Sequence, residues 1–230
     1  MMMMVVIIMQ LILIVMGMFM EPLSIMMLTV PIYFPVIKAF GMNEIWFAAI
    51  MLLNMEMAAT RDMIDIACRV RPDVVTLVPE RREERTTEGG LDVVTHRDVV
   101  GVAVSRLRDA GIKVSLFIDP DARQVAVSRE LGAAQIELHT GDYCDAAPGL
   151  RAPLLDALAR AAREGHALGL EVAAGHGLTR ANVAPVAQID EIVELNIGHA
   201  VIADAIFSGL DRAVASMREA ISRGVAARAR

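Results

Sequence analysis

Residues 77–93 read LVPERREERTTEGGLDV, the end of an apolar run followed by a long charged stretch that closes on two glycines. Apolar cores tolerate many sequences of similar volume, whereas the polar run from Arg81 to Glu88 buries almost nothing. Packing therefore does not account for this stretch. An ordinary solvated loop is the alternative interpretation, and the motifs further along the chain argue against it.

Short apolar runs alternate with amphipathic stretches on both sides of this loop, which is typical of strand-helix units in a parallel sheet. Helical spacing of apolar residues predicts helices over 96–110 and 154–167. Gly111 and Gly169 stand where these helices should end. Strands are expected at about 52–57, 74–79, 113–118, 134–139, 170–174 and 191–197.

These six units predict an α/β fold, a TIM-type (β/α)₈ barrel that lacks its first two βα units. In such barrels the chemistry lies at the C-terminal ends of the strands, and the loops after the seventh and eighth strands often bind phosphate. The stretches AGHGLTRANV (174–183) and ELNIGHAVIADA (194–205) take those two positions when the units are counted from the chain end. Polar residues follow the predicted strands at Glu80, Asp119, His139, His176 and His199.

Each of these two stretches combines glycine with histidine. Glycine lets the backbone approach an anion closely, and the N–H groups that begin the following helix attract negative charge. Gly175, Gly177 and Gly198 are therefore candidates for a phosphate site. A single motif of this kind is more often just a tight turn, but two on adjacent strands favour binding.

The N-terminal residues differ from the rest. Between Met1 and Met55 the only charged side chains are Glu21, Lys38 and Glu44, and fifteen of the sixteen Met residues lie at or before Met63. We expect two domains, a hydrophobic membrane-like segment over 1–50 and an incomplete barrel over 51–230. Residues 1–20 are long enough and apolar enough to cross a bilayer as a helix. A cleaved signal peptide is not expected, because no Lys or Arg precedes Lys38.

Composition narrows the choice of partners. The net charge of -6 comes without a basic patch, so nucleic acid is not an expected partner. Cys68 and Cys144 have neither metal-site nor redox-pair spacing and fit a reducing cytoplasm. No metal site is predicted.

The downstream motifs resemble those of the pyridoxine 5'-phosphate synthase family over about residues 54–222. The resemblance rests on NMEMA, LVPERREERTTEGGLDV, VSLFIDP, IELHTGDY, AGHGLT and ELNIGHA, in this order. It implies the ring-closing condensation of 3-amino-2-oxopropyl phosphate with 1-deoxy-D-xylulose 5-phosphate in vitamin B6 biosynthesis, without metal or organic cofactor. It also implies small phosphorylated substrates, a cytoplasmic location and a homo-oligomer.

The same resemblance assigns roles to individual residues. Glu56 and His176 match catalytic acid/base groups, and proton transfer near neutral pH suits the imine, enol and dehydration steps of such a reaction. The residues that match substrate or phosphate contacts, or that line the site, are Thr86, Gly177, Gly198, His199, Glu137 and His139.

Residues 17–58 resemble the large membrane subunit of tripartite ATP-independent periplasmic transporters, through GMFMEP, the pair Pro31 and Pro35, and Gly41 with Trp46 and Phe47. This part replaces the first two βα units of the synthase family, which carry Asn-x-Asp-His and His-x-Arg motifs. No His or Arg occurs in 1–53 that could substitute for them. We therefore interpret the chain as a chimera with impaired activity and open sheet edges.

Two other functions stay open at this point. One is a catalytically inactive chimera tethered to the inner membrane by residues 1–50. The other is a different phosphate-binding TIM-barrel lyase or isomerase, which would share the two glycine-histidine turns but not the long Arg-Glu-Thr loop.

Overall fold

The computed structural model describes residues 55–79 and 89–228. The chain divides into two units, Met1–Leu53 and Asn54–Arg230, and every described residue belongs to the second. The predicted membrane-like segment, Glu80 and Thr86 therefore lie outside the described residues.

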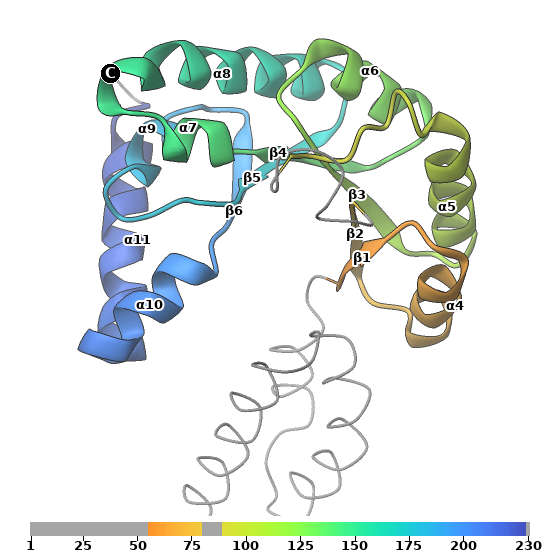
Figure 1. Ribbon diagram of the computed structural model, residues 1–230, viewed down its shortest axis with the longest axis horizontal. Helices are drawn as coiled ribbons and strands as arrows, with labels where there is room; N and C mark the ends of the chain where they lie inside the picture. Colours follow the sequence, from red (N-terminus) through yellow and green to blue (C-terminus); the bar gives the residue numbers. More distant parts are fainter. Residues whose placement is uncertain (1–54, 80–88, 229–230) are drawn as a thin grey trace, which may run out of the picture. The chain divides into compact units, whose positions relative to one another are not determined.

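Six parallel strands form one sheet in which neighbours in space are also neighbours in sequence, in the order β1-β2-β3-β4-β5-β6 (Figure 1). The strands are β1 (Met55–Ala58), β2 (Val74–Val78), β3 (Lys113–Ile118), β4 (Gln135–His139), β5 (Glu171–Gly175) and β6 (Ile192–Asn196). All six expected strands are present within a few residues of their predicted bounds. A parallel sheet of this order is consistent with a TIM-type fold.

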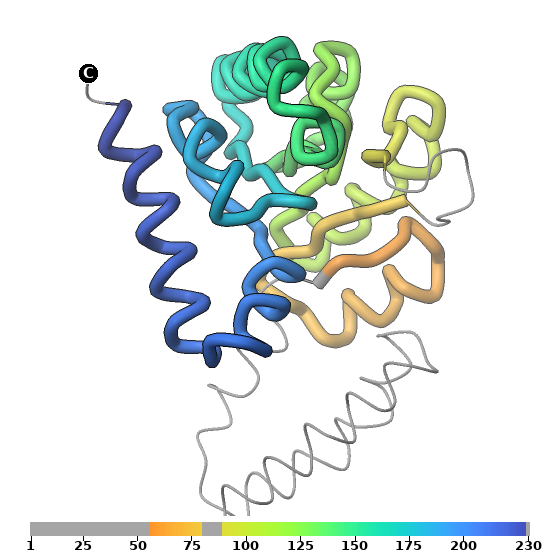
Figure 2. The backbone as a smooth tube through the Cα atoms, turned by 60° about the vertical axis from the view of Figure 1, so that its left-hand side comes forward, coloured from red at the N-terminus to blue at the C-terminus, as the bar shows by residue number. Residues whose placement is uncertain are grey.

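Helices connect the strands and line the outer side of the sheet, as Figures 1 and 2 show from two directions. They are α4 (Arg61–Val70), α5 (Arg97–Asp109), α6 (Ala122–Glu130), α7 (Gly141–Asp145), the 3₁₀ turn η1 (Pro148–Leu150), α8 (Arg151–Ala167), α9 (Val183–Ala187), α10 (His199–Ser208) and α11 (Leu210–Ala226). The two predicted helices correspond to α5 and α8. Helix α10 packs along α11.

The ends of these helices follow local chemistry. Gly111 and Gly169 have φ angles of +79° and +78°, which side chains with a Cβ rarely adopt, so they stop α5 and α8 as expected. Helix α6 begins at Asp121, whose carboxylate accepts hydrogen bonds from the N–H groups of Arg123 and Gln124.

Alternation along the strands separates an apolar layer from a polar one. On β4, Ile136 lies against Gly165 of α8, close enough that a Cβ on this glycine would be 2.8 Å from its Cδ1 atom. Because successive side chains of a strand point to opposite faces, Gln135, Glu137 and His139 point away from the helices. The helix side carries the apolar core, which includes Leu77, Leu116, Ile118, Ile136 and Leu138, all fully buried.

The two edges of the sheet are formed by β1 and β6. On β6, Val193 is 68% exposed, although the middle of a parallel strand is normally covered on both faces. Among residues 55–79 and 89–228, no helix is both long enough and apolar enough to cross a membrane.

Candidate active site

The candidate site lies on the polar face of the sheet, at the C-terminal ends of β3, β4 and β5. The β5 residues on this face are small, because Ala173 and Gly175 are the ones that lie on the same face as Glu137 of β4. They leave room above β5 for side chains from the neighbouring strands. A Cβ on Gly175 would be 2.3 Å from Oε1 of Glu137 and 3.0 Å from Cβ of Asn196. Glycine at 175 therefore lets side chains from β4 and β6 meet across β5.

Glu137 occupies that space. Its side chain is buried, and its Oε2 atom accepts a hydrogen bond of 2.8 Å from Nδ2 of Asn196. Burial raises the pKa of Glu137 to about 7, the bond from Asn196 opposes this rise, and the nearby carboxylates of Glu56 and Glu194 add to it. A carboxyl group with such a pKa can both give and take a proton near neutral pH.

His139 lies two residues further along the same face. Its Nδ1 is 3.2 Å from Oδ1 of Asp119, and its ring packs edge-on against Phe117 at a centroid distance of 5.2 Å. The same Asp119 oxygen accepts a 2.8 Å hydrogen bond from the N–H of Gly90. The bond with His139 lowers the pKa of Asp119, and the Gly90 N–H lowers it further against the effect of burial.

His176 follows β5 in a left-handed backbone conformation, with φ of +80°. This conformation is uncommon for residues other than glycine and is found mostly where the surrounding structure enforces it. Thr140 supplies that support: its Oγ1 is 2.7 Å from the carbonyl oxygen of Gly175 and 2.5 Å from that of His176, and its N–H donates to Gly175 as well. The His176 ring lies 5.1 Å from that of His139, centroid to centroid.

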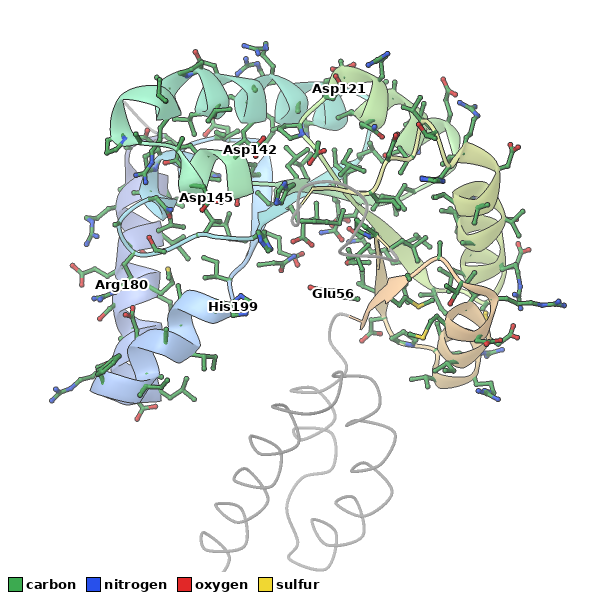
Figure 3. The ribbon with its side chains drawn as sticks, viewed as in Figure 1. Glu56, Asp121, Asp142, Asp145, Arg180 and His199 are labelled. Carbon is green, nitrogen blue, oxygen red and sulfur yellow. The ribbon has the colours of Figure 1, made fainter. Side chains whose placement is uncertain are left out.

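Of the other predicted site residues, Gly177 directly follows His176, whereas Glu56, Gly198 and His199 lie on or next to the two edge strands. Figure 3 shows Glu56 on β1 and His199 at the start of α10 pointing toward one another from opposite edges of the sheet, and both are exposed. Gly198 precedes α10, and a Cβ at this position would meet no other group within 4 Å. Gly177 has φ of +77° and packs against Cys144 of α7. Thr86 is outside the described residues.

Sequence reasoning missed three residues that support the cluster. Asn196 and Thr140 were not selected, and Asp119 was recognised only as a polar residue at a strand end. The period-two spacing from Glu194 to Asn196 would have placed Asn196 on the same face as the predicted site. No comparable signal identifies Thr140, because its role depends on the turn at His176. Among the described residues, no three His, Cys, Asp or Glu side chains gather where a metal ion could be held.

Together these features define a class of protein, a parallel α/β protein that is consistent with a TIM-type fold and carries ionisable side chains at the C-terminal ends of its strands. The family model described as pyridoxal phosphate biosynthesis protein PdxJ matches residues 37–223. The chain belongs to the PdxJ family.

Close relatives are pyridoxine 5'-phosphate synthases. The protein of Xanthobacter autotrophicus is 55% identical over 179 residues, which are 76% of this chain and 70% of that protein. The protein of Syntrophotalea carbinolica is 54% identical over 74% of this chain and 71% of its own length. That of Rhodospirillum rubrum is 54% identical over 76% of this chain and 72% of its own length.

A second family model, the DctM component of tripartite ATP-independent periplasmic transporters, matches residues 1–61. Both predicted resemblances are therefore confirmed. The two matches overlap over 37–61, so strand β1 and its Glu56 lie within both.

Proposed function

We propose that this chain acts in vitamin B6 biosynthesis as a pyridoxine 5'-phosphate synthase, joining 3-amino-2-oxopropyl phosphate to 1-deoxy-D-xylulose 5-phosphate with ring closure. Membership of the PdxJ family supports the activity. The observation that carries it on the structural side is the convergence of Glu137, His139 and His176 at the ends of adjacent strands, where TIM-type enzymes do their chemistry.

The reaction needs groups that exchange protons as imines and enols form and collapse. Glu137 suits this work because its pKa is raised to about 7. His176, in the turn that follows the C-terminal end of β5, is the proposed proton donor. Glu56 on β1 is the proposed acid/base carboxylate. Thr86 is proposed as a substrate contact, and the phosphate contacts proposed are Gly177, Gly198 and His199.

The finer description of the fold is part of this proposal. The described sheet is a (β/α)₈ barrel without its first two βα units, and the matched residues amount to only 67–72% of the length of the relatives compared. Residues 51–230 form the catalytic domain, and the hydrophobic residues 1–50 form a separate segment. The missing units would lie between β6 and β1, beside Glu56 and His199.

The test is product formation by the purified full chain, given both phosphorylated substrates, beside a version in which the two N-terminal units of a relative replace residues 1–50. The proposal expects the restored version to form pyridoxine 5'-phosphate and to lose turnover by about 10²-fold or more when His176 is replaced by Gln. Turnover by the unmodified chain would show that the two units are dispensable. A restored, folded chain without turnover would overturn the proposal.

A further inference from the structure

The His139 side chain is 5% exposed, and its two ring nitrogens have different surroundings. Nδ1 faces the carboxylate of Asp119, whereas Nε2 is buried without a hydrogen-bond partner in the described part of the chain. A buried polar atom without a partner destabilises the folded state, because it has lost its hydrogen bonds to water. Such atoms are rare in folded proteins and call for a specific explanation.

The partner at Nδ1 determines which nitrogen carries the proton. Asp119 has a lowered pKa, so near neutral pH it is ionised and can only accept hydrogen bonds. Nδ1 must therefore be the protonated nitrogen, and Nε2 of the neutral ring keeps its lone pair. The N–H of Gly90 donates to the same Asp119 oxygen and fixes the carboxylate in this orientation.

Nε2 points toward the turn that holds the proposed proton donor. A Cβ on Gly141 would be 2.6 Å from Nε2 of His139 and 3.5 Å from Cδ2 of His176, so this nitrogen and the His176 ring flank the same glycine. Among the residues that the structure describes, the ionisable groups shown to interact with the His139 ring are Asp119, His176 and Glu137.

We propose that Asp119 is a positioning residue, which fixes the tautomer of His139 so that Nε2 is a proton-accepting nitrogen beside His176. A proton that reaches Nε2 bonds to its lone pair, and the resulting imidazolium is balanced by the Asp119 carboxylate, which stays ionised. The proton leaves by the same nitrogen, and no redox partner is needed. The use of this proton rests on the proposed function, whereas the tautomer does not.

The assignment also gives a reason for Gly90, which ends the long charged loop. A Cβ at this position would be 2.3 Å from the backbone nitrogen of Asp119, so only glycine brings its own N–H onto the carboxylate. The Gly90 N–H, Asp119 and His139 thus link the end of the loop to the histidine pair.

Nitrogen-15 NMR of the full chain labelled in its five histidines tests the tautomer directly. His139→Gln assigns the His139 signals. The expected spectrum of the unmodified chain has the proton of the neutral His139 ring on Nδ1 and none on Nε2. A proton on Nε2 of the neutral ring would overturn the proposal, and this measurement needs no variant that might unfold.

Three variants then test the role of Asp119. Asp119→Ala removes the acceptor, so the proton is expected to move to Nε2, the nitrogen preferred by a free imidazole. Asp119→Asn should restore the Nδ1 proton, because the Gly90 N–H keeps a carbonyl oxygen at this position. Asp156→Asn, an exposed change on α8, is the matched control and should have no effect. An unchanged tautomer in folded Asp119→Ala would refute the role of Asp119, whereas a missing product in the synthase assay would refute only the proposed function.

Discussion

The middle of the sheet and its two edges differ in how far the site is already assembled. At the ends of β4 and β5 Glu137 is 4% exposed, His139 6% and Thr140 fully buried, and the exposed Asp119 that follows β3 is paired with His139. At β1 and β6 the corresponding groups, Glu56 and His199, are exposed, and no hydrogen bond of their side chains is seen among the described residues. On this polar face, Glu137 and His139 in the centre are therefore buried, whereas Glu56 and His199 at the edges are exposed.

This difference indicates that a polar side chain on a strand is buried and fixed only where residues of neighbouring strands contact it. Asn196 shows it well, because it lies on an edge strand but reaches across the small β5 residues to Glu137. Edge residues without such a neighbour remain exposed to water. The central cluster depends on contacts with neighbouring strands on both sides, whereas Glu56 and His199 lie at the two edges of the described sheet.

The largest expected effect concerns the buried carboxyl of the centre. The pKa of Glu137 is raised from 4.5 to about 7, so the folded chain binds more protons than the unfolded chain between these values. The free energy of unfolding should therefore fall as pH rises across this window, by about 3 kcal/mol. Glu137→Gln should lose this decrease, because glutamine does not titrate.

Urea denaturation of both proteins at about pH 4 and about pH 8 measures it. The difference between the two pH values is taken for each protein, and the two differences are then compared. This comparison cancels the contribution of the other titrating groups, which both proteins share. Equal pH dependence in the two proteins would mean that Glu137 is solvated like an edge residue, and the contrast between centre and edge would disappear.

The sequence allowed the central site residues to be predicted, but not all of the residues that hold them in place. The resemblance to the synthase family predicted Glu137, His139 and His176, and alternation along the strand accounts for Glu137 and His139 lying on one face. Thr140, Asp119 and Asn196 were harder to recognise, since their roles depend on partners 20 to 59 residues away. At the edges, the same resemblance predicted Glu56 and His199, but a sequence pattern does not show whether a neighbouring strand is present.

Two glycines, Gly175 in the centre and Gly198 next to an edge strand, allow the tightness of packing in the two regions to be compared. Gly175→Ala places a methyl group 2.3 Å from Oε1 of Glu137, so we expect a loss of about 2 kcal/mol in the free energy of unfolding. Gly198→Ala adds its methyl group in open space and should change stability by less than about 0.5 kcal/mol. Thermal unfolding of the two variants measures the difference. Equal losses would show that the centre adjusts as freely as the edge.

A smaller effect is expected at Thr140, which braces the left-handed turn of His176. Thr140→Val keeps the shape but removes the hydroxyl group beside the carbonyl oxygens of Gly175 and His176, at a cost of about 1 kcal/mol. Thr140→Ser keeps the hydroxyl and should retain the His176 environment. The chemical shifts of the His176 ring report on the turn, and they should move in Thr140→Val alone. Shifts in both variants would point to packing of the methyl group instead.

The smallest effect measures whether an edge acts on the centre through charge. Burial is the main cause of the raised pKa of Glu137, the Asn196 bond opposes it, and the carboxylate of Glu56 raises it further. Glu56→Gln should therefore lower the pKa of Glu137 and shift the pH dependence of stability toward acid, and Glu194→Gln should act in the same direction. Because exposed charges are screened by salt, the shift from Glu56→Gln should shrink as ionic strength rises. If the pKa of Glu137 does not move, the charge of Glu56 on β1 does not act on the centre of the site.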